Sequence, residues 1–394
     1  MSPLEIRASV SLAAIFALRL LGLFLILPVF AVYAPSIPGG NDPTLVGLAL
    51  GIYGLTQGVL QIPYGVASDR WGRKPVIAAG LVVFAMGSFV AAAADDIFWT
   101  IVGRAIQGAG AISAAVTASI ADATRDEHRT KAMALVGASV GVTFAGSLVL
   151  APALYPMIGV KGLFALTGIL VIGAIGVLIW IVPSAPQTAE SSAAHSNDRI
   201  WLNPQLLRLN VGIFVLHTVL MAMFVVLPAL LVIRGGLPLS EHWKVYLPVV
   251  LLSFALMMKP LMIAERRALI RPLFIGSIVL VLAALLGLVL HGASLLWLGV
   301  WLLVFFIGFN ILEACLPSLV SRVAPASAKG LALGIYNTAQ ALGLFAGGVM
   351  GGLVAQRWGV EAVFGFAALV TAAWCLIAVG MQEVPIKASA APMG

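Results

Sequence analysis

The sequence predicts an all-α membrane protein whose twelve transmembrane helices form two related bundles of six. Of its 394 residues, 61% are hydrophobic and 9% are charged, and the mean hydropathy is +1.09, which excludes an ordinary soluble domain. A bilayer core of about 30 Å requires about 20 apolar residues per helix. Twelve apolar runs of this kind follow one another along the chain. Short motifs also recur about 200 residues apart, which indicates an internal duplication.

The predicted spans fall into two sets of six on either side of one long polar connection. The first set covers residues 8–33, 44–67, 75–94, 97–121, 130–155 and 160–182. The second set covers residues 205–234, 243–264, 271–291, 294–321, 329–354 and 361–381. The segment between them, with SAPQTAESSAAHSNDR at 184–199, has the composition of a flexible linker. We therefore expect an N-terminal bundle over 1–182, a cytoplasmic linker over 183–204 and a C-terminal bundle over 205–394.

Three motif pairs support the duplication. FLILP at 24–28 and FVVLP at 224–228 lie 200 residues apart, and FAG at 144–146 and 345–347 lie 201 apart. The charged turn after the second span, GVASDRWGRK at 65–74, has a weaker echo about 196 residues later, within 260–272. The consistent offset predicts that two copies of one six-helix unit make up the chain.

The net charge of +7 is explained by topology. Sixteen Lys and Arg residues fall on one side of the twelve-span arrangement, and only Lys161, Arg234, Lys244 and Arg357 fall on the other. Short basic loops stay on the cytoplasmic side of a membrane. We therefore expect both termini and the linker in the cytoplasm, and no nucleic-acid partner.

The sequence contains no recognisable catalytic or metal-binding pattern. It has no phosphate-binding glycine loop, no metal-spaced His/Cys cluster and no Ser/His/Asp arrangement above chance. Cys315 and Cys375 both lie inside predicted spans, where we expect them to pack as small apolar side chains. We expect no enzyme activity, no metal and no cofactor.

Four polar groups lie well inside predicted spans, one on every third helix: Arg19, Arg104, His217 and Glu313. A charged group costs several kcal/mol in hydrocarbon, so such residues face a protein interior or a water-filled cavity. We therefore expect the first, fourth, seventh and tenth helices to share a central cavity. Their distances along the chain from flanking basic residues place Arg19, His217 and Glu313 in one layer and Arg104 nearer the outer face.

The motifs resemble the major facilitator superfamily, and in particular its twelve-helix drug:proton antiporter class. The charged turn matches the family pattern GxxxDRxGRK with Gly65, Asp69, Arg70, Gly72, Arg73 and Lys74. The fourth span matches RxxQGxG with Arg104, Gln107, Gly108 and Gly110, and the first span has Gly22 and Pro28 at similar places. A type within this class that has an extra soluble C-terminal domain is similar through LRLLG at 18–22 and LEACLPSL at 312–319. That type is bacterial, so the resemblance implies the inner membrane of a bacterium, and we expect the extra domain to be absent here.

Two departures from the antiporter class are visible. The fifth span reads APALY at 151–155, which keeps a proline but lacks the glycines of the family's GPxxGG signature. The first span has Arg19 where several exporters of cationic drugs carry an acid. A preference for cations is therefore not supported.

The resemblance implies a conformational latch at the charged turn. Asp69 would face the N-terminus of the eleventh helix, near Lys329 and Gly330, where the helix dipole favours a carboxylate. Arg73 would pair with Asp122 at the inner end of the fourth helix. The alternative is that the turn serves only as a basic topology anchor.

For proton coupling, Glu313 is the first candidate and His217 the second, because a histidine titrates near neutral pH. The alternative for Glu313 is a fixed ion pair with Arg19 or another cation, and for His217 an inter-helix hydrogen bond. Arg104 either contributes to coupling or substrate electrostatics, as the family pattern implies, or positions helices through backbone carbonyls.

The substrate-lining candidates are apolar, aromatic or amide side chains. Phe24, Met221 and Asn310 lie on the expected cavity helices, and Tyr53, Gln57 and Tyr336 lie on the glycine-rich second and eleventh helices. Residues of this kind adapt to varied ligands, although most simply pack against neighbouring helices.

Together these observations predict a monomeric secondary transporter that exports small amphipathic compounds in exchange for protons by alternating access. Its partners would be a small-molecule substrate, protons and the lipid bilayer, with the proton gradient as energy source. The alternatives are a metabolite facilitator or symporter of the same fold, or a non-transporting membrane sensor.

Overall fold

The computed structural model describes residues 1–183, 203–291, 294–325 and 328–382. These ranges contain helices and no strand. The N-terminal helices are α1 (Pro3–Phe24), α2 (Phe30–Tyr33), η1 (Ala34–Ser36), α3 (Pro43–Trp71), α4 (Arg73–Ala93), α5 (Ile97–Ala109), α6 (Ser113–Ala123) and α7 (Asp126–Trp180). The C-terminal helices are α8 (Pro204–Ile233), η4 (Leu239–Glu241), α9 (Trp243–Arg266), α10 (Ile270–His291), α11 (Leu295–Val323), α12 (Lys329–Trp358) and α13 (Val360–Val379). Most of the predicted linker 183–204 lies outside the described residues.

The first predicted span, 8–33, is wrong at both ends. The helix begins at Pro3, because Ser2 and Glu5 cap it reciprocally: Ser2 N donates to Glu5 Oε2 at 2.6 Å and Glu5 N donates to Ser2 Oγ at 3.3 Å. It ends at Phe24, ahead of Pro28, which has no N–H to donate to the helix. A short second helix, α2, follows after this interruption.

The fourth predicted span, 97–121, is wrong as a single helix. It is divided into α5 and α6, because Gly110 has non-helical dihedrals (φ −73°, ψ 54°). A Cβ at Gly110 would collide with the backbone oxygen of Gly80 on α4. The close approach of α4 therefore requires glycine at this break.

Helix α7 contains two membrane crossings. Its 55 residues would extend about 80 Å as a straight helix, far more than one bilayer. Gly159 interrupts it with a left-handed φ of 63°. Lys161, just after this glycine, donates to Asp95 at the end of α4, whereas Val182 accepts from Lys74 at the start of α4. The chain therefore reverses at Gly159, so the eleven described stretches that are long and apolar enough to span a membrane make twelve crossings.

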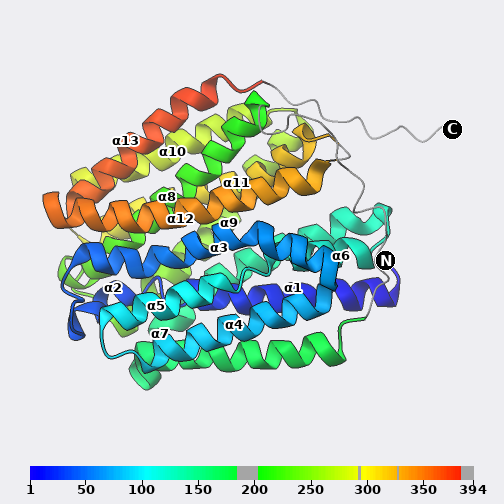
Figure 1. Ribbon diagram of the computed structural model, residues 1–394. Coiled ribbons are helices and arrows are strands. Elements are labelled where there is room, and N and C mark those ends of the chain that lie inside the picture. The colour runs from blue at the N-terminus through cyan, green and yellow to red at the C-terminus, as the bar shows by residue number, and fades with distance from the viewer. Residues whose placement is uncertain (184–202, 292–293, 326–327, 383–394) are drawn as a thin grey trace.

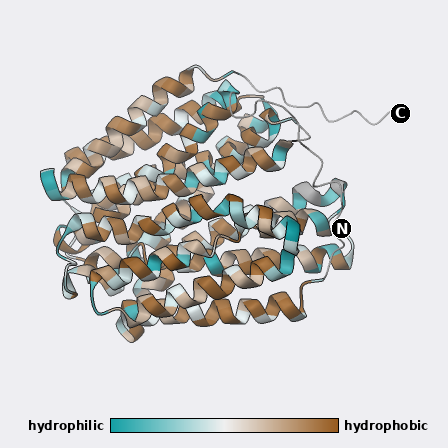
Figure 2. Cartoon of the chain, viewed as in Figure 1, coloured by the Kyte–Doolittle hydropathy of each residue, from teal (hydrophilic) through white to brown (hydrophobic). Residues whose placement is uncertain are grey.

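The helices form two stacked layers, one containing α1 to α7 and the other α8 to α13 (Figure 1). Helix α1 packs along α7, α4 along α5 and α7, and α10 along α11 and α13. Helices α3 and α12 pack together across the two layers. Hydrophobic residues run along the helices and hydrophilic ones gather near their ends, as expected for spans in a bilayer (Figure 2).

A matched pair of contacts demonstrates the duplication. Lys74 Nζ donates to the carbonyl oxygen of Val182 at 2.5 Å, and Arg271 Nη2 donates to that of Val379 at 2.9 Å. Both partners are offset by 197 residues, since 271 − 74 and 379 − 182 give the same number. In each half, a basic residue at the start of the third span therefore satisfies a carbonyl at the end of the sixth, as cations do at helix C-termini.

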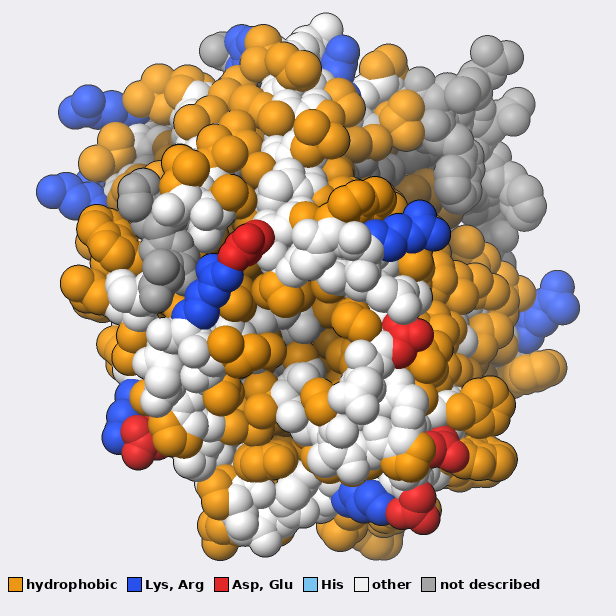
Figure 3. All heavy atoms as spheres, turned by 90° about the vertical axis from the view of Figure 1, so that its left-hand side faces the viewer, with side chains coloured by type: hydrophobic (Ala, Val, Ile, Leu, Met, Phe, Trp, Pro, Cys, Tyr) orange, Lys and Arg blue, Asp and Glu red, His pale blue; other side chains and the backbone are white. Residues whose placement is uncertain are grey.

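The two ends of the molecule differ in charge. We call the end with the α3–α4 turn, the start of α1 and the start of α12 the basic end, and the other the opposite end. On the opposite end, acidic side chains lie beside basic ones (Figure 3). Lys161 Nζ lies 2.5 Å from Asp95 Oδ1, and Arg234 pairs with Glu361. The Lys161 ammonium group, through its hydrogen bond and charge, lowers the pKa of Asp95 below its ordinary value.

Candidate functional site

Three side chains from three helices meet inside the second layer. They are His217 of α8, Glu313 of α11 and Gln340 of α12, and we call them the polar triad. Gln340 Nε2 lies 2.8 Å from His217 Nε2 and donates to Glu313 Oε1 at 3.3 Å. His217 Nε2 and Glu313 Oε2 are 3.9 Å apart. The structure therefore brings together the two candidate proton sites and adds an amide between them.

In the described structure, no cation pairs with the carboxylate of the triad. Among the residues that the structure describes, no Lys or Arg forms a hydrogen bond or ion pair with Glu313. Its Oε2 atom has no hydrogen-bond partner, and neither has the nearby hydroxyl of Tyr336. About a third of the Glu313 side chain (31%) is accessible, although it contacts α8, which is buried over most of its circumference. Part of the Glu313 side chain is therefore accessible, whereas its Oε2 atom is itself buried.

Arg19 lies in a separate polar cluster in the first layer. It is fully buried, and its Nη1 donates to Ser113 Oγ at 3.0 Å while its Nη2 donates to Gln57 Oε1 at 3.1 Å. Ser113 and Glu313 lie 200 residues apart, close to the 198 between Arg19 and His217. The Arg19–Ser113 pair and the His217–Glu313 pair thus occupy related places in the two halves. The alternative of an Arg19–Glu313 ion pair is wrong for this structure.

Arg104 is held mainly by backbone oxygens. It is completely buried, and it donates to the carbonyls of Gly22 and Ala49 at 3.3 Å and of Leu50 at 3.4 Å. Its Nη1 also donates to Gln107 Oε1 at 3.0 Å. These bonds tie α5 to α1 and α3. Of the four residues expected to share one cavity, the structure brings only His217 and Glu313 into contact.

Tyr53 connects the two buried arginines. The Arg19 guanidinium carbon lies 5.6 Å from the centre of its ring and that of Arg104 lies 5.0 Å away. Both are within the range of cation–π attraction. The Tyr53 hydroxyl is buried without a hydrogen-bond partner in the described structure. The N-terminal layer thus contains a fixed, cationic interior.

The other expected lining residues lie at or near the core. Met221 is fully buried, and Asn310 Nδ2 donates to Ser253 Oγ at 2.9 Å between α11 and α9. Phe24 packs edge-on against Phe144 with ring centres 5.1 Å apart. Phe144 also contacts rings of the second layer, namely Phe224, Phe306 and Phe309. This aromatic group joins the layers beside the triad.

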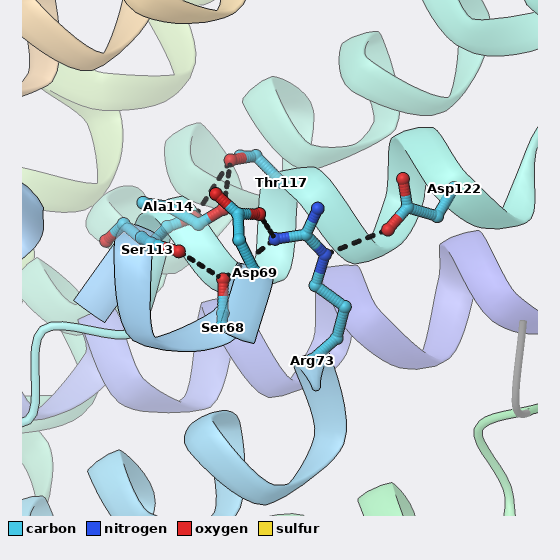
Figure 4. A network of polar contacts seen from close by, with 8 residues as sticks. Ser68, Asp69, Arg73, Ser113, Ala114, Thr117 and Asp122 are labelled. Atoms are coloured by element: carbon cyan, nitrogen blue, oxygen red, sulfur yellow. Dashed lines mark hydrogen bonds and ion pairs between the residues drawn. The ribbon is translucent and has the colours of Figure 1, made fainter. Parts of the chain in front are cut away.

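The charged turn forms part of the expected relay. Arg73 Nε donates to Asp122 Oδ2 at 2.8 Å and its Nη1 donates to Ser68 Oγ at 2.8 Å, and Arg73 also pairs with Asp69 (Figure 4). Gly72 makes the turn possible with a φ of 93°. The predicted Arg73–Asp122 pair is therefore present.

The rest of the turn plays simpler roles. Arg70 is exposed, Lys74 holds the end of α7, and Gly65 packs near Ala114 of α6, where a Cβ would lie 3.5 Å from that side chain.

The expected contact of Asp69 with the start of α12 is absent from the described structure. The Asp69 side chain is 47% exposed and its ion pair is with Arg73. A Cβ at Gly330 or at Gly334 would have no atom within 4 Å. The prediction is wrong for this conformation because the two layers are separated at the basic end.

At the opposite end the two layers are in close contact. A Cβ at Gly348 of α12 would lie 2.9 Å from the Gly51 Cα of α3, closer than side chains tolerate, and would collide with the Gly47 oxygen. Thr44 and Gln356 also form a hydrogen bond across this interface. The described conformation is therefore closed at the opposite end.

Sequence reasoning missed Gln340, Ser113 and Phe144. The proton-site candidates were chosen among titratable residues inside spans, and neither the amide of Gln340 nor the hydroxyl of Ser113 is titratable. An amide in an apolar run is itself a signal, because its polar atoms require partners in a membrane. The partners of Phe144 depend on packing between layers and have no sequence signature.

Comparison with known proteins gives a consistent result. Residues 12–348 and 271–392 match the family model of the Major Facilitator Superfamily. The chain is 42% identical over 393 residues to the inner membrane transport protein YajR of Escherichia coli (strain K12), covering 99% of this chain and 86% of that protein. It is 26% identical over 346 residues to the multidrug resistance protein MdtH of Yersinia enterocolitica, covering 85% of this chain and 82% of that one.

The solved structures agree on the fold. A bacterial homologue of the human lysosomal transporter Spinster, in an inward-facing and occupied conformation, superposes with a TM-score of 0.79 at 13% identity. The match covers 98% of this chain and 100% of that one.

Proposed function

Because the chain belongs to the major facilitator superfamily of membrane transporters, we propose that it exports small amphipathic compounds from a bacterial cell in exchange for protons. Both termini and the basic end would lie in the cytoplasm, and transport would proceed by alternating access. Glu313 would carry the coupling proton. The single observation behind this proposal is a carboxylate inside the membrane whose side chain is partly accessible and has no cationic partner among the described residues.

The orientation follows from charge. Basic residues concentrate at one end, and positively charged loops favour the cytoplasmic side. The YajR relative is an inner membrane protein by name, which supports the same membrane for this chain. With the basic end inside, the described conformation faces the cytoplasm, since its layers are closed at the opposite end.

The proton assignment rests on charge balance. A carboxylate taken out of water needs a hydrogen-bonded cation or a proton. Gln340 supplies a neutral donor to Glu313, and His217 is a neutral ring when its Nε2 accepts a hydrogen bond. A proton on the carboxylate would remove this charge.

Antiport requires that the carrier bind the proton and the substrate in alternation. The side chains beside the triad are aromatic: the Phe309 ring centre lies 6.0 Å from that of His217, and Phe144 packs against Phe309. Such rings offer apolar area to an amphipathic compound. A compound with a hydrogen-bond donor or a positive group would stabilise the ionised Glu313, and protonation would favour its release.

Export, rather than uptake, is supported by a family relative. MdtH is a multidrug resistance protein by name and matches 85% of this chain. The absence of an acid in the first span argues against selection of cations there, and Arg19 is engaged by Ser113 and Gln57. The substrate class is therefore amphipathic compounds without a required positive charge.

The experiment is transport into proteoliposomes of purified protein, with a chemically diverse panel of amphipathic compounds and an imposed pH gradient. We expect accumulation of at least one compound that collapses when an ionophore dissipates the gradient. Transport that is unaffected by the pH gradient would instead identify a facilitator. Absence of flux for every compound, together with specific binding of one of them, would favour a sensor.

A further inference from the structure

We propose that Gln340 of α12 is a positioning residue that directs the coupling proton to Glu313 by keeping the Nε2 lone pair of His217 occupied. This inference rests on the proposed function and deepens it. It concerns which of two neighbouring titratable groups takes the proton. The carboxylate and the imidazole lie 3.9 Å apart, so a proton entering the site could reach either group.

The hydrogen bond at Nδ1 fixes the tautomer of His217. Nδ1 lies 3.2 Å from the carbonyl oxygen of Ile213, one helical turn earlier. A carbonyl oxygen only accepts, so Nδ1 carries the hydrogen. In a neutral ring the other nitrogen, Nε2, then presents a lone pair and needs a donor.

The Gln340 amide supplies that donor. One amide nitrogen carries two hydrogens. In Gln340 one hydrogen is directed to His217 Nε2 at 2.8 Å and the other to Glu313 Oε1 at 3.3 Å. A protonated Nε2 donates a hydrogen bond, so the Gln340 amide would have to rotate by half a turn to present its oxygen. Both of the bonds from its nitrogen would then be lost.

The remaining open acceptor is on the carboxylate. Glu313 Oε2 has no hydrogen-bond partner in the described structure, whereas Oε1 is occupied by Gln340. A proton on Oε2 leaves both amide bonds intact. The geometry therefore favours protonation of the carboxylate over protonation of the imidazole.

The donor is held in place by helix packing. Thr218 of α8, next to His217, donates from Oγ1 to the Gly343 carbonyl of α12 at 3.2 Å. A Cβ at Gly343 would lie 3.0 Å from the Phe214 Cα, so the two backbones touch there. Gln340 is one helical turn from this contact. All three triad helices belong to the same layer, so rocking of one layer against the other leaves the triad assembled.

Few other groups face His217. From α11 it meets Glu313 and the ring of Phe309, and from α12 it meets Gln340, with Tyr336 one turn away. In the part of the chain that the structure describes, no Lys or Arg on α3, α11, α12 or α13 forms an ion pair with His217 or Glu313. The titration of His217 therefore depends on Glu313, Tyr336 and the Gln340 donor.

The test is nitrogen-15 NMR of histidine side chains in the full chain, reconstituted in lipid nanodiscs, between pH 8 and pH 5. A His217→Gln sample assigns the signals. Gln340→Met keeps the side-chain length and removes both donor hydrogens. Gln382→Met, the same substitution at an exposed glutamine after α13, is the matched control.

In the wild type and in Gln382→Met, His217 should show a protonated Nδ1 and a hydrogen-bonded, unprotonated Nε2 at every pH. In Gln340→Met, the Nε2 signal should shift at pH 8, and the ring should take up a proton as the pH falls. A protonated Nε2 in the wild type, an unchanged Nε2 signal in Gln340→Met, or a ring that stays neutral there would overturn the proposal.

This readout is independent of substrate. If wild-type transport proves insensitive to a pH gradient while His217 behaves as expected, the proposed proton-coupled function fails and the role of Gln340 at His217 stands. If transport is proton-driven and Gln340→Met leaves both the NMR signals and the pH profile of transport unaltered, the role of Gln340 fails alone. In the expected case, the pH profile of Gln340→Met gains a second titrating step.

Discussion

Gly348 offers a direct way to bias the conformational equilibrium. It lies where α12 meets α3 at the opposite end, and a Cβ there would lie 2.9 Å from both the N and Cα atoms of Gly51. Gly348→Ala therefore forces the two backbones apart in the described conformation. When the opposite end opens, the strain disappears.

The magnitude follows from overpacking. An extra methyl group in a tightly packed contact costs about 1 to 3 kcal/mol. The gain in helix propensity, about 1 kcal/mol for Gly→Ala, is the same in both conformations and cancels. The population open at the basic end should therefore fall relative to the other by about 5- to 150-fold.

The assay is a distance measurement by pulsed electron paramagnetic resonance, with spin labels replacing Arg70 at the end of α3 and Leu331 at the start of α12. Both side chains are exposed in the described conformation. The native thiols Cys315 and Cys375 are replaced beforehand. We expect a long distance in the parent protein and a larger short-distance fraction in Gly348→Ala.

The matched control is Gly334→Ala on the same helix, where a Cβ would meet no atom within 4 Å. This variant should keep the parent distribution. Equal distributions for Gly348→Ala and Gly334→Ala would refute the reasoning.

Three further predictions concern individual charges. The family resemblance implies that the other conformation places Asp69 at the N-terminus of α12; if it does, Asp69→Asn should enlarge the population open at the basic end by about 2- to 30-fold, and an unchanged or shortened spin-label distance would contradict this. Arg104→Leu removes the hydrogen bonds that tie α5 to α1 and α3, leaves Gln107 Oε1 without its Arg104 donor, and should lower the free energy of unfolding by about 2 to 5 kcal/mol. Thermal unfolding in detergent should show this loss of stability for Arg104→Leu and almost none for Arg70→Leu at an exposed position. Equal losses in the two variants would disprove the structural role of Arg104. Lys161 lowers the pKa of Asp95, so the stability from this pair is complete above the ordinary carboxyl pKa of about 3.9 and is lost as pH falls through the lowered value. Asp95→Asn should therefore flatten the acid side of the unfolding profile, and an identical profile would argue against the pair.

Most of the fold was predictable because hydrophobic length and basic loops are strong local signals. The break between α5 and α6 was not, since it depends on the close approach of α4 at Gly110. The reversal within α7 was placed correctly between two spans, but its single-residue turn at Gly159 depends on a left-handed backbone. The early stop of α1 could have been inferred from Pro28.

The candidate site was only partly predictable. Titratable residues inside apolar spans are expected to face the protein interior, and this rule identified Glu313 and His217. The structure brings the two together through Gln340. The same rule also suggested Arg19 and Arg104 for the same cavity, whereas Ser113, Gln57 and backbone carbonyls bind them elsewhere. Sequence spacing gives the depth of a residue, but the face it presents depends on how each helix is rotated in the bundle.

The most direct test of Glu313 as the coupling group compares two modes of transport in one variant. Uphill accumulation driven by a pH gradient requires protonation and deprotonation, whereas exchange of labelled for unlabelled substrate requires only alternating access. Glu265→Gln, an exposed glutamate at the basic end, is the control. We expect Glu313→Gln to abolish uphill accumulation and retain exchange, and Glu265→Gln to retain both. Undiminished uphill accumulation in Glu313→Gln would contradict the account.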